Sequence, residues 1–108
     1  MSNDPYQTMS QLALGPSLRV VRGANAPMRL PVLGERVVIG RRACDVLLSD
    51  QEVSGAHAEI VRMGSGYMLR DLGSTNGTFL GSGKLTKPMP LEVGSTLRIG
   101  KTIFELRK

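Results

Sequence analysis

The sequence predicts an all-β domain, a sandwich of about eleven short strands with its ligand-binding loops at one end. The 13 Gly and 6 Pro among 108 residues require many tight turns, and such turns join the short strands of all-β folds. Apolar residues occur in short runs between those turns, and no segment spaces them as an amphipathic helix does. With no Trp, two Tyr and two Phe, the core must be aliphatic.

The residues that form turns place the strands in order. In the first half we expect strands over residues 18–22, 28–33, 36–40 and 46–48. Pro31 makes the second of these an edge or irregular strand, because proline cannot donate to a ladder. In the second half we expect strands over residues 56–62, 67–71, 78–80, 84–85, 88–91, 96–99 and 102–106, with 84–85 and 88–91 irregular.

The strand expected over residues 56–62 shows the clearest alternation. One face of this strand carries Ala56, Ala58 and Ile60, and the other carries His57, Glu59 and Val61. The turn over residues 64–66 then predicts a hairpin with residues 67–71.

Residues 1–16 differ in composition from the rest of the chain. They are polar and Met-rich, and Pro5 and the Gly15-Pro16 pair interrupt them. We expect a flexible N-terminal tail over residues 1–16 and one domain over residues 17–108.

The chain carries a formal net charge of +5, which indicates an acidic or phosphorylated partner. Nucleic acid is disfavoured because the basic residues are scattered along the sequence and aromatic stacking platforms are nearly absent. No apolar run is long enough to span a bilayer, and the first residues do not resemble a secretory signal. No membrane partner is therefore expected.

Cys44 is the single cysteine, so it can form neither an intramolecular disulfide nor a thiolate zinc site. It is interpreted as a small apolar filler, and its isolation favours a reducing, cytoplasmic location. No metal and no cofactor are expected.

Three predicted loops, over residues 40–42, 50–55 and 73–77, are rich in polar donors. A phosphate dianion needs a fork-shaped cation and several neutral donors. Arg41 or Arg42 fits the first need. Ser54, Thr75, Asn76 and loop N–H groups fit the second, so the loops predict a pocket for a phosphorylated side chain.

Some of these residues also admit two other interpretations, a catalytic one and a purely structural one. Ser54 beside His57 could suggest a hydrolase, but no orienting carboxylate, oxyanion hole or nucleophile-elbow signature accompanies them, so the protein is not expected to be an enzyme. The Asn76-Gly77 pair is most simply a type I′ turn, which could still aim the Asn76 side chain at a ligand.

The same loop segments, together with the residues around them, resemble a known protein family. The Gly40-Arg41 pair, the Ser54-x-x-His57 spacing and the segment from Ser74 to Phe79 closely resemble the forkhead-associated (FHA) domain, and the match spans roughly residues 18–106. The resemblance implies an eleven-stranded β-sandwich that binds phosphothreonine peptides at its loop end.

The resemblance also assigns roles to residues of this chain. Arg41 would contact the phosphate or the adjacent peptide backbone, and Ser54 and Thr75 would hydrogen-bond the phosphate. Asn76 would hold the peptide main chain. Three further residues would shape the loops rather than touch the ligand: Gly40, His57 and Gly77.

One departure from the family pattern bears on binding. Gly55 stands where the family often has Arg, Lys or Asn, which often adds a phosphate contact, and Arg42 is the residue that could compensate. The expected function is therefore a non-catalytic phosphothreonine-binding module downstream of Ser/Thr kinase signalling, a monomer when unphosphorylated. The alternative is a phosphorylation-independent interaction or oligomerisation domain on the same fold.

Overall fold

Two β-sheets pack face to face in the computed structural model, which describes residues 17–31 and 35–107. Those residues form eleven strands and no helix, which confirms the predicted all-β sandwich. In the part of the chain described, no helix is long and apolar enough to cross a membrane. The predicted tail over residues 1–16 and the end of the strand expected over 28–33 lie outside the described residues.

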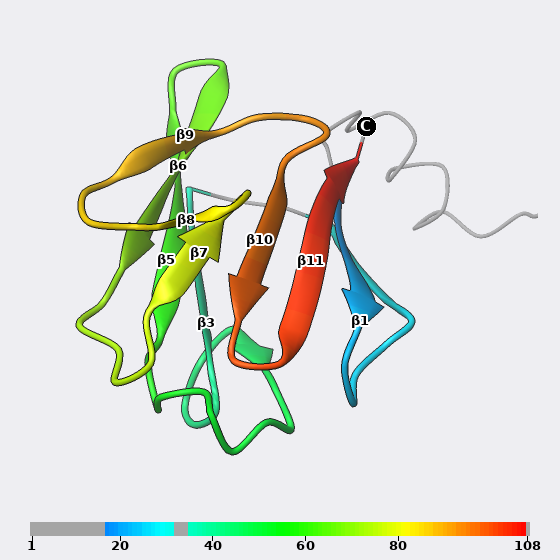
Figure 1. Cartoon of the computed structure of the whole chain (residues 1–108). Helices are drawn as coiled ribbons and strands as arrows, with labels where there is room; N and C mark the ends of the chain where they lie inside the picture. The colour runs from blue at the N-terminus through cyan, green and yellow to red at the C-terminus, as the bar shows by residue number, and fades with distance from the viewer. Residues whose placement is uncertain (1–16, 32–34, 108) are drawn as a thin grey trace, which may run out of the picture.

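The first sheet has six strands in the order β2-β1-β11-β10-β7-β8. Its strands are β1 (Ser17–Arg22), β2 (Met28–Pro31), β7 (Thr78–Leu80), β8 (Gly83–Lys84), β10 (Thr96–Ile99) and β11 (Thr102–Arg107). Each is antiparallel to its neighbours, and β1, β11, β10 and β7 run side by side in Figure 1. The short β2 and β8 therefore form the edges of this sheet.

The second sheet has five strands in the order β4-β3-β5-β6-β9. Its strands are β3 (Arg36–Gly40), β4 (Val46–Leu47), β5 (Ala58–Met63), β6 (Gly66–Asp71) and β9 (Met89–Leu91). The β5–β6 hairpin at its centre matches the predicted one. Only β3 and β4 pair in parallel among the described strands.

Alternate residues of the two sheets build the core between them. In β1 and β11, Leu18, Val20, Phe104 and Leu106 are almost completely buried, and the residues between them point outward. The fully buried side chains of the described residues include one aromatic ring, that of Phe104. The other buried apolar side chains of the described residues are aliphatic, as the composition predicts. Five polar or charged residues are also buried: Ser17, His57, Glu59, Thr78 and Thr102.

The strand expected over residues 56–62 begins two residues later than predicted, although Ala58 and Ile60 share the buried core face as expected. The strand begins at Ala58 and Ala56 is exposed, whereas His57 and Glu59 are buried although their parity assigned them to the opposite face from Ala58. Glu59 is 3% exposed because Arg36 and Arg70 on the two neighbouring strands both pair with its carboxylate, Arg70 at 2.6 Å. Cross-strand ion pairing thus covers a charged side chain on the outer face of the sheet.

Candidate functional site at the loop end

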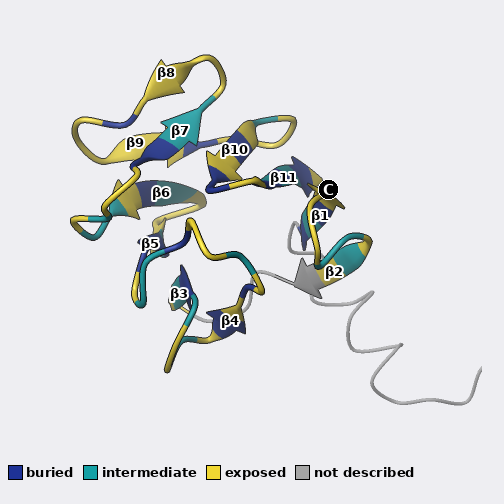
Figure 2. Cartoon of the chain, turned by 60° about the horizontal axis from the view of Figure 1, so that its bottom comes forward, coloured by how far each residue is buried: buried dark blue, intermediate teal, exposed yellow. Residues whose placement is uncertain are grey.

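Three loops come together at one end of the sandwich. They join β3 to β4 (residues 41–45), β4 to β5 (48–57) and β6 to β7 (72–77). All three lie at the lower end of the molecule in Figure 1, and Figure 2 brings that end forward. The fold therefore gathers all six candidate ligand-binding residues at one end: Arg41, Arg42, Ser54, Gly55, Thr75 and Asn76.

Gly40, the last residue of β3, permits a close approach between the first two loops. The N–H of Arg41 donates to the carbonyls of Ser54 at 3.1 Å and Gly55 at 2.9 Å, and the N–H of Arg42 donates to Gly55 at 3.2 Å. A Cβ at position 40 would lie 1.9 Å from the Gly55 carbonyl oxygen. Any side chain at position 40 would push the Arg41 loop away from the Ser54 loop.

His57 is fully buried and links the second loop to the third. Its Nδ1 accepts the N–H of Ser54 at 3.0 Å, so Nε2 carries the ring proton and donates to the Gly77 carbonyl at 2.8 Å. Its backbone N–H donates to Ile39 at 2.9 Å, and its carbonyl accepts the N–H of Leu72 at 2.9 Å. The side chain and backbone of this one residue therefore set the positions of two loops relative to β3.

The bonds of His57 also bear on the hydrolase interpretation. Nδ1 accepts the backbone N–H of Ser54 rather than its hydroxyl, and Nε2 is engaged by Gly77. Neither ring nitrogen is available to take a proton from the Ser54 hydroxyl. The arrangement is that of a structural histidine.

Two side-chain bonds cross between the second and third loops. The Ser54 hydroxyl oxygen accepts the N–H of Thr75 at 3.0 Å, and Asn76 Nδ2 donates to the Glu52 carbonyl at 2.9 Å. As an acceptor, Ser54 keeps its own hydroxyl proton for another partner. Asn76 likewise keeps its Oδ1 as an acceptor.

Asp71 organises the third loop, a role that sequence reasoning missed. Its Oδ2 accepts the N–H groups of Gly73 and Ser74, each at 3.0 Å, and its Oδ1 accepts the hydroxyls of Ser74 at 2.5 Å and Thr78 at 2.6 Å. Burial raises the pKa of the Asp71 carboxyl, but these bonds outweigh burial and hold the pKa below its ordinary value of 3.8. An Asp followed by Gly and Ser two and three residues later was the available signal.

The Asn76-Gly77 pair does not form the type I′ turn that the sequence predicted. That turn needs a positive φ at both central residues, but only Gly77 of the two has one, at +87°. Gly77 is instead the end of a turn in which its N–H donates to the Ser74 hydroxyl oxygen at 2.9 Å. A Cβ at Gly77 would lie 2.7 Å from Cε of Lys84, a flexible side chain that could move aside, so the positive φ is what requires glycine.

Arg41 and Arg42 supply cations that pair with no carboxylate in the described part of the chain. None of the ion pairs among the described residues includes either guanidinium. The one side-chain contact of Arg41 is a long 3.5 Å bond from Nη1 to the Gln51 carbonyl, and Arg42 is exposed. Two charged donors therefore lie on the loop whose backbone is bonded to the Ser54 loop, with capacity left for an anion.

Cys44 is more than the apolar filler that the sequence predicted. Its Sγ lies 2.9 Å from the Arg42 carbonyl and 3.0 Å from the Gly55 carbonyl, so the thiol bonds within the first loop and across to the second. The side chain is half-buried. A thiol can donate weakly to a carbonyl, which explains why this position is polar in its contacts.

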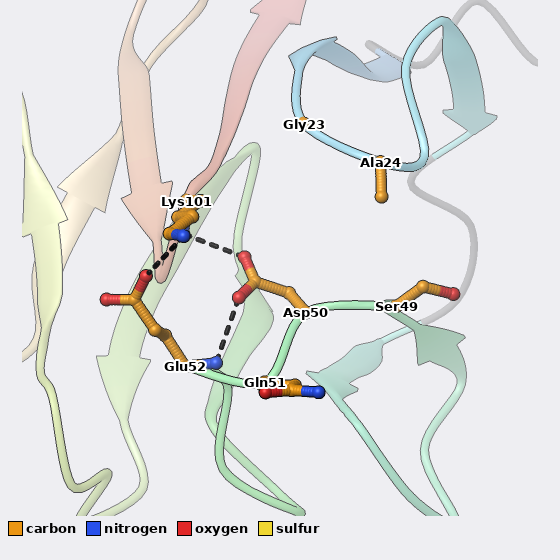
Figure 3. Close-up of a pocket in the computed structure, with 7 residues that line it drawn as sticks. All are labelled: Gly23, Ala24, Ser49, Asp50, Gln51, Glu52 and Lys101. Carbon is orange, nitrogen blue, oxygen red and sulfur yellow. Dashed lines mark hydrogen bonds and ion pairs between the residues drawn. The ribbon is translucent and has the colours of Figure 1, made fainter.

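A cleft of ≈ 360 Å³ opens beside the loop end, between the β4–β5 loop and the turns that follow β1 and β10 (Figure 3). Its lining consists of Gly23, Ala24, Ser49, Asp50, Gln51, Glu52 and Lys101. The carbonyls of Gln51 and Glu52, on the cleft wall, are those that contact Arg41 and Asn76. The cleft and the loop site therefore share one loop.

Asp50 holds the wall of this cleft in place. Its Oδ1 accepts the N–H of Glu52 at 2.9 Å, and its Oδ2 accepts the N–H of Lys101 at 2.7 Å and the hydroxyl of Thr102 at 3.0 Å. Burial raises the pKa of the Asp50 carboxyl, but hydrogen bonds, led by those from Glu52 and Lys101, outweigh it and lower that pKa. Asp50 is thus an anchor for the loop rather than a free carboxylate.

Comparison with known proteins finds relatives of this chain. The family model of the FHA domain matches residues 37–100. The chain is 42% identical over 91 residues to the FHA domain-containing protein FhaB of Mycolicibacterium smegmatis, and the match covers 83% of the chain and 59% of that relative. The chain thus spans little more than half the length of this relative.

Solved structures share the sandwich. The FHA domain of a Chlamydia trachomatis protein superposes with a TM-score of 0.82 at 27% identity, over 86% of this chain and 96% of that one. A second structure, from a study of phosphothreonine-dependent FHA domain interactions, gives a TM-score of 0.77 at 26% identity, over 86% and 95% of the two chains.

Proposed function

Because the chain belongs to the FHA domain family, we propose that it is a non-catalytic binding module that recognises phosphothreonine in a partner protein. The partner would be the product of a Ser/Thr kinase. The module binds it as a monomer and needs no metal or cofactor.

One observation carries this proposal. The guanidinium groups of Arg41 and Arg42 have no carboxylate partner among the described residues, and both lie on the β3–β4 loop, which is bonded to the loop of Ser54. A phosphate dianion offers three strong acceptor oxygens to such donors. An anion is the ligand class that this arrangement of unneutralised cations and spare hydroxyl protons favours.

Each residue has a role in the proposed complex. Arg41 binds the phosphate or the peptide backbone beside it, while the hydroxyls of Ser54 and Thr75 donate to phosphate oxygens. Asn76 keeps its Oδ1 for a main-chain N–H of the peptide, since its Nδ2 is used by Glu52. The loops that carry these groups are already bonded to each other, so little ordering entropy is lost on binding.

The loop-structuring residues act indirectly. Gly40 allows a close approach that a Cβ would prevent, and Gly77 supplies a positive φ. His57 bonds two loops at once. In the comparison structures, phosphothreonine dependence is a property named for one FHA domain that is 26% identical to this chain. That similarity supports the same ligand class here.

Gly55 favours a second candidate, an interaction or oligomerisation domain that does not depend on phosphorylation. This residue follows Ser54 and has no side chain, so it offers the phosphate no charged contact. A site with one anchor fewer would bind a phosphate more weakly. Arg42, exposed on the adjacent loop, is the residue that would compensate.

An oriented peptide library with phosphothreonine fixed at its centre tests the proposal. Binding of the selected peptide is measured by calorimetry beside matched peptides with threonine and with phosphoserine at that position. We expect binding of the phosphothreonine form, weaker binding of the phosphoserine form because one methyl of packing is lost, and no measurable binding of the threonine form. Equal affinity for the phosphorylated and unphosphorylated forms would favour the second candidate.

A further inference from the structure

The outer face of the six-stranded sheet gathers arginines that are scattered in the sequence. Residues directly opposite one another on neighbouring strands share a face, and Arg19 lies opposite both Arg29 and Glu105. Arg98 faces the same side, two positions from Thr96, which is also opposite Glu105. Arg107 follows Glu105 by two positions in β11 and so joins them.

This outer arginine face consists of Arg19, Arg29, Arg98 and Arg107. Within the described strands of the sheet, Glu105 is its one carboxylate, and Arg107 pairs with it at 2.6 Å. The other sheet treats its arginines differently, since Arg36 and Arg70 share the carboxylate of Glu59. The outer arginine face therefore carries four arginines against one carboxylate, whereas the cluster on the other sheet carries two arginines against one.

The pair formed by Arg19 and Arg29 is unfavourable as it stands. Like charges directly opposite each other on adjacent strands destabilise a sheet. Arg29 donates to the neutral Ser17 hydroxyl at 3.2 Å, and no carboxylate pairs with either arginine among the described residues. An external anion seated between them would relieve this repulsion.

Apolar groups accompany these charges. The guanidinium of Arg98 lies 4.0 Å from the centroid of the Phe79 ring and donates to the Gly100 carbonyl at 3.1 Å, so its position is defined. Ile103, half-buried, is opposite Arg98, and Val21 is 40% exposed at the irregularity in β1. The face thus offers both cations and apolar contact area.

We propose that the outer arginine face is a second docking surface, which binds an acidic, partly apolar segment of a partner protein. Guanidinium groups match carboxylates with paired hydrogen bonds, and the apolar neighbours match side chains between the carboxylates. Nucleic acid fits less well, because Arg98 already covers the one aromatic ring on the face, that of Phe79. The surface lies on strands rather than on the loop end, so this inference is independent of phosphothreonine binding.

Charge-reversal variants of the full chain test this surface. The probe is a short Glu-rich synthetic peptide with interspersed leucines, and its binding is measured by fluorescence anisotropy at low ionic strength. Arg19→Glu/Arg29→Glu is compared with Arg62→Glu/Lys87→Glu, which makes the same change in net charge at exposed positions elsewhere. We expect the first variant to lose about tenfold or more in affinity and the second to bind nearly as wild type does.

Two further measurements control for misfolding and for an effect on the phosphothreonine site. Arg19→Gln/Arg29→Gln removes the charges without introducing new ones and serves if the reversal variant does not fold. Phosphothreonine-library binding is recorded for every variant and should be retained, so that failure of one proposal is distinguishable from failure of the other.

Three outcomes would overturn the inference. Equal losses in both charge-reversal variants would show a general effect of net charge. Unchanged peptide binding by Arg19→Glu/Arg29→Glu would show that the outer arginine face is not the docking surface. Tighter binding of a single-stranded oligonucleotide or of a phosphatidylserine vesicle than of the Glu-rich peptide, lost in the same variant, would replace the protein segment with another class of partner.

Discussion

The hydroxyl oxygen of Ser54 accepts a hydrogen bond from the backbone N–H of Thr75, 3.0 Å away and 21 residues further along the chain. This bond joins the β4–β5 loop to the β6–β7 loop at the point where both loops carry candidate phosphate-binding residues. It also leaves the Ser54 hydroxyl proton free to donate to another acceptor. One side chain therefore both builds the site and is proposed to bind in it.

Replacing Ser54 with Ala should weaken phosphothreonine-peptide binding by about 1.5–3 kcal/mol, the usual value of a hydrogen bond to a charged group. It should also lower the free energy of unfolding by about 1 kcal/mol, because the Thr75 N–H loses its acceptor. Calorimetry and chemical denaturation measure the two effects. Ser49→Ala, at an exposed serine near the start of the same loop, is the control and should change neither.

Replacing Arg41 with Ala should cost about 1.5–3 kcal/mol of binding free energy and little stability, since its guanidinium makes one long contact within the protein. The control is Arg62→Ala, an exposed arginine of β5. Peptide affinity is read by calorimetry. An unchanged affinity would move the role of anchor from Arg41 to Arg42.

Replacing Gly55 with Arg should strengthen phosphopeptide binding by about 1 kcal/mol, through a new charge-assisted hydrogen bond. A Cβ at this position would meet no atom within 4 Å, and its φ lies outside the left-handed region, so the substitution should be tolerated. Gly55→Ala controls for the backbone and Ala56→Arg for added charge. A gain as large in Ala56→Arg would mean that only net charge has changed.

Phosphopeptide affinity should fall as the pH is lowered through about 6, because the phosphate gains its second proton there and loses half of its charge. The titrating group belongs to the ligand. Calorimetry between about pH 7.5 and 5.5 measures the effect. Thermal unfolding over the same range is the control, and a flat affinity would argue that the site does not bind a dianion.

Replacing Asp71 with Asn should destabilise the fold by about 1–3 kcal/mol at neutral pH, because four donors lose a carboxylate acceptor. The folded-state pKa of Asp71 lies below its ordinary value, so its contribution is complete above about pH 4 and is lost as the pH falls through the folded-state pKa. The gap in unfolding free energy between wild type and variant should therefore narrow in acid.

A matched substitution isolates the hydrogen-bond network of Asp71. Glu92→Gln removes one negative charge at an exposed position. Its unfolding free energy should follow that of wild type at every pH. A pH-independent gap for Asp71→Asn would contradict the proposed cause of its lowered pKa.

The sequence could predict the strands, turns and site residues that are marked by a pattern within a few consecutive residues. The sandwich was predicted from glycine and proline at turns and from short apolar runs. The candidate residues of the loop end were predicted from three short motifs in order: Gly-Arg, Ser-x-x-His and Thr-Asn-Gly. The strand at Ala58 shows the limit of such signals. Parity assigned Glu59 to the opposite face from Ala58, and no local pattern reveals that Arg36 and Arg70 would cover it.

The sequence by itself determined the fold class and which residues could meet an anion, because turn formation and side-chain chemistry are properties of a few consecutive residues. Tertiary structure alone decided which of those groups are free. The side chains of Asp71 and His57 are fully engaged in hydrogen bonds that fix the loops. Arg41 and Arg42, in contrast, form no ion pair with a carboxylate among the described residues. Strand register also brought Arg19 opposite Arg29, since pairing depends on contacts between segments far apart in the chain.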